Sequence, residues 1–205
     1  MTVIVDYGVG NLFSLKSSFN AIGENVVVSS DAETVRRADR IVLPGVGAFS
    51  DAAYKLKNSG LESVIKAAVK DGTPLLGICL GMQLLFDKSF EFGEYDGLGL
   101  IKGEVVPIPK KAGLKIPHIG WNAINLTRPH PLFKYLKSGD FVYFVHSYYA
   151  ANCDKSVIAT TEYGSVLTAA VADKNVLGCQ FHPEKSGEVG LKILKAFCEI
   201  KRGEL

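Results

Sequence analysis

The sequence predicts an α/β protein built on a doubly wound, mostly parallel sheet, with an antiparallel extension in the second half of the chain. Two observations support this prediction. In the first half, short runs of Val, Ile and Leu alternate with segments of helical periodicity, as in parallel sheets that helices cover on both faces. After residue 97, strand-like runs follow one another with turns between them, which is typical of antiparallel pairing.

The first half contains four expected strands separated by helices. The strands are short and apolar, which favours burial on both faces; they are Thr2–Val5, Asn25–Ser29, Arg40–Leu43 and Pro74–Ile78. The helices are expected at Leu12–Ala21, closed by Gly23, at a segment that Ser30 opens with Glu33 as its capping box, at Ala52–Lys57 and at Leu61–Lys70. Helix-compatible spacing also runs from Leu80 to Phe86. This order of elements is that of a flavodoxin-like sheet.

The second half is expected to add strands at Leu98–Val106, His118–Leu126, Phe141–Tyr149, Val157–Thr161 and Val166–Ala172. A strand at Asn175–Phe181 and an amphipathic helix at Val189–Lys201 close the chain. We predict one domain over residues 1–205, because this length can bury a substantial core and no linker-like stretch divides it.

Composition excludes several classes of partner. A formal charge of +2 without a basic run argues against nucleic acid. The N-terminus shows no secretory leader, and no apolar stretch reaches the ~18 residues that a membrane helix needs, so we expect a cytoplasmic protein without a membrane partner. The four cysteines lack CxxC spacing, and neither a metal site nor a cofactor is expected. Cys179 and Cys198 are expected in the core.

Cys79 is the strongest candidate for a catalytic residue. It lies in Gly77-Ile78-Cys79-Leu80-Gly81, directly after an apolar strand and before the expected helix. Glycines beside a nucleophile on a sharp strand-to-helix turn let backbone pass close to the side chain. A helix N-terminus would also favour the thiolate. A lone cysteine in such a crossover is more often a buried packing residue, so a base is needed to support the assignment.

His182 and Glu184 supply that base and its orienting carboxylate. In an extended segment, side chains two residues apart leave on the same face, so Glu184 can accept from one imidazole nitrogen while the other nitrogen faces the thiol. Pro183 restricts the backbone between them. A His-Pro-Glu at a strand end is otherwise often a turn with a solvated carboxylate, and the pair gains its meaning from Cys79.

A third loop is expected at the same edge of the sheet. Pro44-Gly45-Val46-Gly47 follows the strand Arg40–Leu43, and carboxyl ends of parallel strands share one edge. The Val46 N–H and the Leu80 N–H could then form an oxyanion hole; an ordinary tight turn is the alternative. Gly8-Val9-Gly10 lacks the third glycine of a dinucleotide-binding loop, because position 13 is Phe.

These motifs carry a resemblance to a known family. Gly77–Gln83 and His182-Pro183-Glu184 are similar to the motifs of class I glutamine amidotransferases, which hydrolyse glutamine through a Cys-His-Glu triad. Within that class, four further segments resemble the glutaminase subunit of imidazole glycerol phosphate synthase: Asp6–Asn11, Pro44–Phe49, Pro117–Asn122 and His146–Tyr149.

The resemblance implies further roles. Glutamine would be held by Gln83, Glu91, Ser147, Tyr148 and the backbone of Gly47. Ammonia would pass through a tunnel to a (β/α)₈ cyclase subunit, forming a heterodimer that makes imidazole glycerol phosphate and AICAR from PRFAR in histidine biosynthesis. Asn11, Trp121 and Tyr143 would face that partner. Other roles are open for several of these residues. Gln83 could instead cap its helix, Ser147 and Tyr148 could simply end a strand, and Trp121 could be a core aromatic.

Three alternatives remain open from the sequence. A stand-alone cysteine hydrolase on the same scaffold would work without a partner. A non-enzymatic interaction module would use Cys79 only for packing or redox sensing. A glutaminase subunit of another pathway, such as pyridoxal phosphate synthesis, would share the triad.

Overall fold

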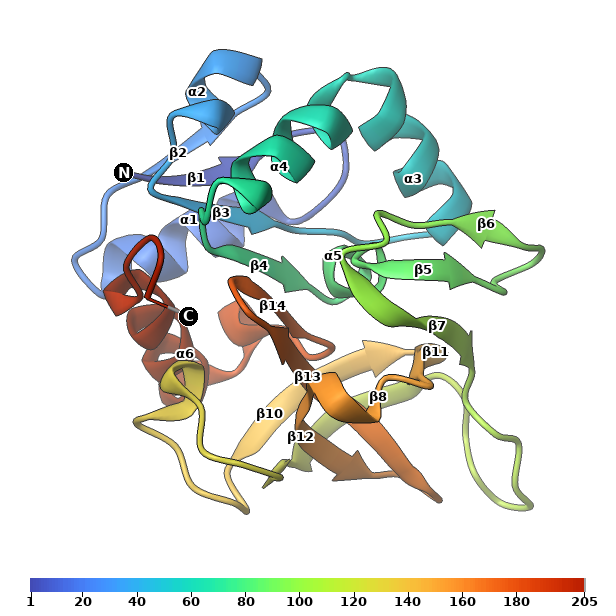
Figure 1. The fold of residues 1–205 in the computed structure, drawn as a ribbon. Helices are drawn as coiled ribbons and strands as arrows, with labels where there is room; N and C mark the ends of the chain where they lie inside the picture. Colours follow the sequence, from blue (N-terminus) through green and yellow to red (C-terminus); the bar gives the residue numbers. More distant parts are fainter. Residues whose placement is uncertain (205) are drawn as a thin grey trace.

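The computed structural model describes residues 1–204 and is organised around an eight-stranded sheet (Figure 1). The strands lie in the order β2-β1-β3-β4-β14-β13-β12-β9. Their bounds are β1 Thr2–Val5, β2 Val26–Ser29, β3 Arg40–Leu43, β4 Leu75–Ile78, β9 Asn125–Leu126, β12 Val157–Glu162, β13 Val166–Asp173 and β14 Val176–Cys179. The first five strands in the spatial order pair in parallel, and β13, β12 and β9 extend the sheet antiparallel. The predicted fold class is confirmed.

Helices cover both faces of the parallel strands. They are α1 Leu12–Ala21, α2 Ala32–Arg36, α3 Phe49–Asn58, α4 Leu61–Lys70, α5 Leu80–Gln83 and α6 Gly187–Glu199. In β1, Val3 and Val5 pack in the apolar cluster that contains α2, α3 and α4, whereas Ile4 packs in the cluster that contains α1 and α6. Alternate residues of a buried strand therefore serve the two layers (Figure 1).

Two smaller sheets stand beside the parallel strands. One pairs β8 (His118–Ala123) with β10 (Phe141–His146), and the other has the order β11-β7-β5-β6. The strands of the second are β5 Phe86–Ser89, β6 Tyr95–Asp96, β7 Ile101–Pro107 and β11 Tyr148–Ala151. Short 3₁₀ turns occur at Pro131–Phe133, Asp154–Ser156 and Pro183–Lys185.

Three sequence-based expectations are wrong in detail. The helix after Cys79 ends at Gln83, and Phe86 instead begins β5. The expected strands His118–Leu126 and Phe141–Tyr149 are each two strands, the second divided at Ser147. The cap of α2 is Asp31, whose carboxylate accepts from the Thr34 N–H at 2.8 Å; Glu33 instead pairs with Arg36.

The described residues contain no helix long and apolar enough to cross a membrane.

The carboxyl ends of β3, β4 and β14 lie side by side, because these strands are neighbours in the sheet. The loop after β3 contains Pro44–Gly47, Cys79 follows β4, and Gln180 to Glu184 follow β14. Ligands of open α/β sheets bind beyond this edge, so the fold brings all three predicted motifs to one place.

Candidate functional site

Cys79 lies on a sharp turn between β4 and α5. Its backbone has φ 54° and ψ −111°, which is a strained conformation for a residue with a side chain. The turn is packed against β3 without any spare room: a Cβ on Gly81 would lie 1.9 Å from the Leu43 carbonyl oxygen, and one on Gly77 would lie 2.6 Å from the Gly81 carbonyl oxygen. These two glycines therefore permit the close backbone contacts that the motif predicts.

The Cys79 sulfur is mostly buried but lines a pocket. Its Sγ lies 3.9 Å from the Val145 carbonyl oxygen, to which the thiol can donate, and the Gln180 Nε2 donates to the sulfur from 3.8 Å. Because α5 is only one turn long, the expected contribution of a helix macrodipole to the thiolate is small. The polar neighbours of the sulfur matter more.

His182 and Glu184 form a buried pair. His182 Nδ1 lies 2.7 Å from Glu184 Oε1, and both side chains are almost inaccessible to solvent. The pairing was expected from an extended segment, but Glu184 lies in the 3₁₀ turn Pro183–Lys185 that Pro183 opens. The His182 N–H donates to the Tyr143 carbonyl oxygen at 2.9 Å, and the Ser186 hydroxyl donates to the His182 carbonyl oxygen at 2.6 Å, so the turn has little freedom.

The environment of His182 favours the imidazolium. Burial lowers the pKa of His182, but the nearby Cys79 sulfur and the Glu184 carboxylate outweigh burial and raise the pKa to about 10. The Nε2 atom has no hydrogen-bond partner among the described residues, and His182 lines the same pocket as Cys79. A thiolate beside an imidazolium is the arrangement that makes a cysteine nucleophilic at neutral pH.

The pocket at this edge has a volume of about 290 Å³, near the lower end of the range of small-molecule sites. It brings together nearly every residue predicted for catalysis and substrate binding. Its lining includes Val46, Gly47, Cys79, Leu80, Gln83, Glu91, Ser147, Tyr148 and His182. Glu184 lies behind His182 and does not line the pocket.

Contacts of the predicted binding residues are specific. The Gln83 amide donates to the Tyr148 carbonyl oxygen at 3.1 Å and to Gln180 Oε1 at 3.0 Å, so its amide joins β11 to the segment after β14. A carboxylate oxygen of Glu91 accepts from the Phe49 N–H at 2.5 Å, at the first residue of α3. Ser147 and Tyr148 lie where β10 gives way to β11.

The loop after β3 is held from two sides. A Cβ on Gly45 would lie 2.7 Å from the Gly81 backbone nitrogen, so the loop lies directly against the Cys79 turn. On its other side, the buried Tyr7 hydroxyl donates to the Pro44 carbonyl oxygen at 2.7 Å. Burial and the nearby Cys79 raise the Tyr7 pKa, which keeps the hydroxyl a donor. Val46 and Gly47 remain exposed.

Sequence reasoning missed several residues of this site. Gln180 contacts both the Cys79 sulfur and Gln83. Its position two residues before His182 could have indicated that it belongs to the site, since alternate residues of an extended segment share a face. Tyr7 and the Val145 carbonyl gave no comparable signal, because their contacts join segments far apart in the chain.

A pair of buried histidines, His146 and His118, lies beside the site, and His146 lines the pocket. His146 Nδ1 lies 2.9 Å from the Tyr148 carbonyl oxygen, which can only accept, so Nδ1 carries the proton. His146 Nε2 then accepts from His118 Nδ1 at 2.9 Å, and the Asn122 amide nitrogen lies 3.3 Å from His118 Nε2. Burial lowers the pKa of both histidines to about 4. Two neutral rings therefore extend the polar contacts of the site toward β8.

This pair predicts an acid-sensitive fold. An unfolded histidine titrates near pH 6.5, so between about pH 6.5 and 4 the unfolded chain binds more protons, and stability falls as the pH is lowered. His118→Gln removes one of these groups. We expect its stability to depend less on pH in this range than that of the wild type, by up to about 1.4 kcal/mol per pH unit, in denaturant unfolding at each pH.

Tyr163→Phe is the matched control, since the Tyr163 ring stacks on His118 with ring centroids 3.9 Å apart, and the variant keeps that ring and both histidines. It should keep the wild-type pH dependence. An unchanged pH dependence in His118→Gln would contradict the neutral-ring assignment.

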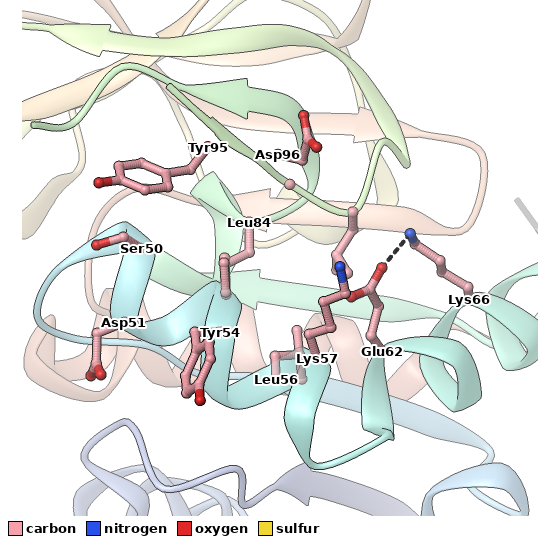
Figure 2. Close-up of a pocket in the computed structure, with 13 residues that line it drawn as sticks. Ser50, Asp51, Tyr54, Leu56, Lys57, Glu62, Lys66, Leu84, Tyr95 and Asp96 are labelled. Atoms are coloured by element: carbon pink, nitrogen blue, oxygen red, sulfur yellow. Dashed lines mark hydrogen bonds and ion pairs between the residues drawn. The ribbon is translucent and has the colours of Figure 1, made fainter. Parts of the chain in front are cut away.

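A larger cavity of about 850 Å³ lies elsewhere, between α3, α4 and the segment around β6 (Figure 2). Figure 2 shows Tyr54 of α3 and Tyr95 of β6 beside it, and the ion pair between Glu62 and Lys66 on α4. None of the described cysteines or histidines lines this cavity. Size therefore does not identify the candidate site, whereas the chemistry of the lining side chains does.

The residues predicted to face a partner are not part of the pocket lining. The Trp121 side chain is 53% exposed, so the alternative of a core aromatic is wrong. It packs edge-to-face against Tyr143 with ring centroids 6.2 Å apart, and Lys185 lies over the Tyr143 ring. Asn11 is exposed and caps α1 through the Ser14 N–H. Their assignment to an interface stays a prediction.

The chain is similar to known proteins along nearly its whole length. A family model described as glutamine amidotransferase class-I matches residues 3–200. The imidazole glycerol phosphate synthase subunit HisH of Lactococcus lactis is 53% identical over 96% of this chain and 97% of its own, and that of Aquifex aeolicus is 50% identical over 96% and 95%. Among solved structures, PurLQS from Thermotoga maritima has a TM-score of 0.73 at 22% identity, covering 96% of each chain, and thus shares the fold.

Proposed function

Because the chain belongs to the class I glutamine amidotransferase family, we propose that it is the glutaminase subunit of an imidazole glycerol phosphate synthase acting in histidine biosynthesis. The observation that carries the proposal is the buried His182–Glu184 pair, because its His182 lines the same small pocket as the strained Cys79. The names of relatives near 50% identity, which align along almost the whole chain, support the choice of subunit. We also propose that residues 1–205 act as one amidotransferase domain.

In the first half of the reaction, the Cys79 thiolate attacks the side-chain amide carbon of glutamine. The carbonyl π electrons move to the oxygen, and the Val46 and Leu80 N–H groups stabilise the resulting oxyanion. Collapse of this intermediate breaks the C–N bond while His182 donates its proton to the leaving nitrogen. Ammonia departs and a glutamyl thioester remains on Cys79.

In the second half, His182 is neutral and acts as a base. It removes a proton from a water molecule that attacks the thioester, and the C–S bond breaks to release glutamate and restore the thiolate. Glu184 accepts from Nδ1–H and keeps the ring oriented, so that Nε2 faces the reacting atoms in both halves. The 2.7 Å contact and the burial of the pair suit this orienting role.

Glutamine binding is assigned to the rest of the lining. The carboxylate of Glu91 can pair with the substrate's α-ammonium group, and Ser147, Tyr148 and the Gly47 backbone can bind its polar end groups. Gln83 already uses its NH₂ donors within the protein, so it would contact glutamine through its side-chain oxygen. Its hydrogen bond to the Tyr148 carbonyl oxygen also holds the Tyr148 backbone in place.

Ammonia is useful only if an acceptor site receives it before it is lost to water. We propose that a (β/α)₈ cyclase subunit docks over the pocket and receives ammonia through an internal tunnel. Trp121, Tyr143 and Asn11 would contact this partner. Trp121 is exposed and packs against the partly buried Tyr143, and it is a suitable anchor, since aromatic residues are enriched among interface hot spots.

The proposal predicts that glutamine hydrolysis depends on the partner. The isolated chain should hydrolyse glutamine slowly, and addition of the cyclase subunit with its nucleotide substrate should raise kcat by about tenfold or more, a usual size of coupling between sites. Release of glutamate, measured for the chain alone, with the cyclase and with cyclase plus nucleotide, checks this expectation.

Trp121→Ala should weaken binding of the cyclase by about 30-fold, the effect of a typical hot spot. Tyr54→Ala is the control, because Tyr54 is an exposed aromatic at the larger cavity.

Full turnover by the isolated chain would instead favour a stand-alone cysteine hydrolase. Activation by a pyridoxal phosphate synthase partner would favour the other pathway, and a glutamine-mimicking electrophile that fails to label Cys79 would favour a non-enzymatic module.

A further inference from the structure

Gln180 is a fully buried polar side chain that lies next to the reactive sulfur without lining the pocket. Its Nε2 atom lies 3.8 Å from Cys79 Sγ, and its Oε1 atom accepts from Gln83 Nε2 at 3.0 Å. It therefore contacts the Cys79 sulfur from outside the pocket lining.

The direction of the Gln180 amide follows from its neighbours. The Tyr148 carbonyl oxygen can only accept, so the end of the Gln83 amide that faces it must be the NH₂ group. The same NH₂ group faces Gln180, which must therefore present its oxygen to Gln83. The remaining end of the Gln180 amide, its NH₂ group, then has to face Cys79.

The same carbonyl oxygen also accepts from His146 Nδ1 at 2.9 Å. It is thus an acceptor for two side chains, and this holds the Tyr148 backbone against the amide pair. Because Tyr148 belongs to β11, Gln83 to α5 and Gln180 to the segment after β14, three separate elements determine one hydrogen-bond direction. A reversed amide would place two oxygens or two NH₂ groups together at a buried contact, which is costly.

From this geometry, and assuming the proposed glutaminase chemistry, we propose that Gln180 is a positioning residue: its N–H donor holds the Cys79 sulfur in the reactive orientation and stabilises the thiolate. A hydrogen bond to the charged form of a group favours that form. The Val145 carbonyl oxygen is the other polar contact of the sulfur, and it can accept a hydrogen bond only from the protonated thiol. Gln180 therefore favours the thiolate, whereas Val145 favours the thiol.

Other ionisable groups also act on Cys79. His182, from the turn after β14, favours the thiolate, and Glu184 behind it opposes the thiolate. Glu91 lines the pocket as a further acid, His146 is neutral, and Tyr7 is a buried, un-ionised phenol. Gln180 is uncharged, so its replacement by an uncharged residue leaves all of these charges in place.

The test is the pH dependence of alkylation of Cys79 by iodoacetamide in the full chain, with the modified cysteine identified by peptide mass spectrometry. Gln180→Met keeps the approximate shape and removes the donor. We expect the midpoint of alkylation to rise by about one pH unit, which is a tenfold lower thiolate fraction below the midpoint. Gln180→Glu should raise it further, since its carboxylate repels a thiolate.

Thr168→Val is the matched control, because it removes a polar partner from the buried Cys153 and leaves Cys79 untouched. In the complex with the cyclase, Gln180→Met should lower kcat for glutamine about tenfold with little change in KM, because Gln180 does not line the pocket. If Gln180→Met does not fold, Gln83→Leu serves as the second variant. It removes the contact that fixes the direction of the Gln180 amide, so it should also raise the pH midpoint of Cys79 alkylation.

Wild-type midpoints in Gln180→Met, or in Gln83→Leu where the first variant is unfolded, would overturn the proposal. Absence of glutamine hydrolysis by the wild-type complex would refute the proposed function instead, and the alkylation midpoints would still decide the effect of Gln180 on the sulfur.

Discussion

Replacing Cys79 with Ala in a complex with the cyclase subunit should abolish synthesis from glutamine, by about 10⁴-fold or more, and leave synthesis from added ammonium salt intact. The expected loss is large because Cys79 is the one thiol among the described residues that line the pocket, and residues of a triad act as a unit. Free ammonia bypasses the glutaminase step. Product formation with each nitrogen source, measured on the same preparation, checks the expectation.

Cys153→Ala is the matched control, since Cys153 is also buried but lies against Thr168 rather than in the pocket. It should keep both activities. Loss of ammonium-dependent synthesis in Cys79→Ala would mean that Cys79 has a structural role, and retained glutamine-dependent synthesis would rule out Cys79 as the nucleophile.

Gly81→Ala should both destabilise the protein and misplace the nucleophile. The added Cβ would lie 1.9 Å from the carbonyl oxygen of Leu43, a fully buried residue at the end of β3. Neither backbone can move far without breaking the pairing of β3 with β4. We expect a loss of about 3 kcal/mol in the free energy of unfolding and, from a shift of the turn, about 10²-fold lower turnover of glutamine, measured by urea unfolding and glutamate release.

Gly23→Ala separates the steric clash from the general cost of replacing a glycine. Gly23 has φ +79° after α1, with nothing within 4 Å of a built Cβ. Its replacement should therefore cost only the 1–2 kcal/mol or so of a left-handed alanine and leave turnover unchanged. Equal losses of stability in the two variants, with wild-type turnover in Gly81→Ala, would show that the Cys79 turn tolerates a side chain.

Much of the parallel half was predictable from local patterns. The strands Thr2–Val5 and Arg40–Leu43 and the helices Leu12–Ala21 and Leu61–Lys70 have the predicted bounds. In these segments, apolar runs, helical periodicity and end signals all point to the same structure, and consistent local signals are reliable.

Prediction failed where contacts distant in sequence override local preference. Leu80–Phe86 has helical spacing, but Phe86 pairs with Ile101 in β7 and the helix ends at Gln83. The expected strand Phe141–Tyr149 is broken at Ser147 because its two halves join different sheets. Which strand a segment pairs with is decided by its partners, and short-range periodicity does not contain that information.

The sequence by itself determined the type of chemistry. A cysteine between glycines at a strand end and a His-Pro-Glu after another strand are chemical signatures that can be recognised without coordinates. Only the tertiary structure decided how the sulfur is surrounded. Val145, Gln180 and Tyr7 reach the site from three separate segments, and such contacts exist only after the chain has folded, because hydrogen bonds of this kind depend on distances of a few ångströms between residues far apart in the sequence.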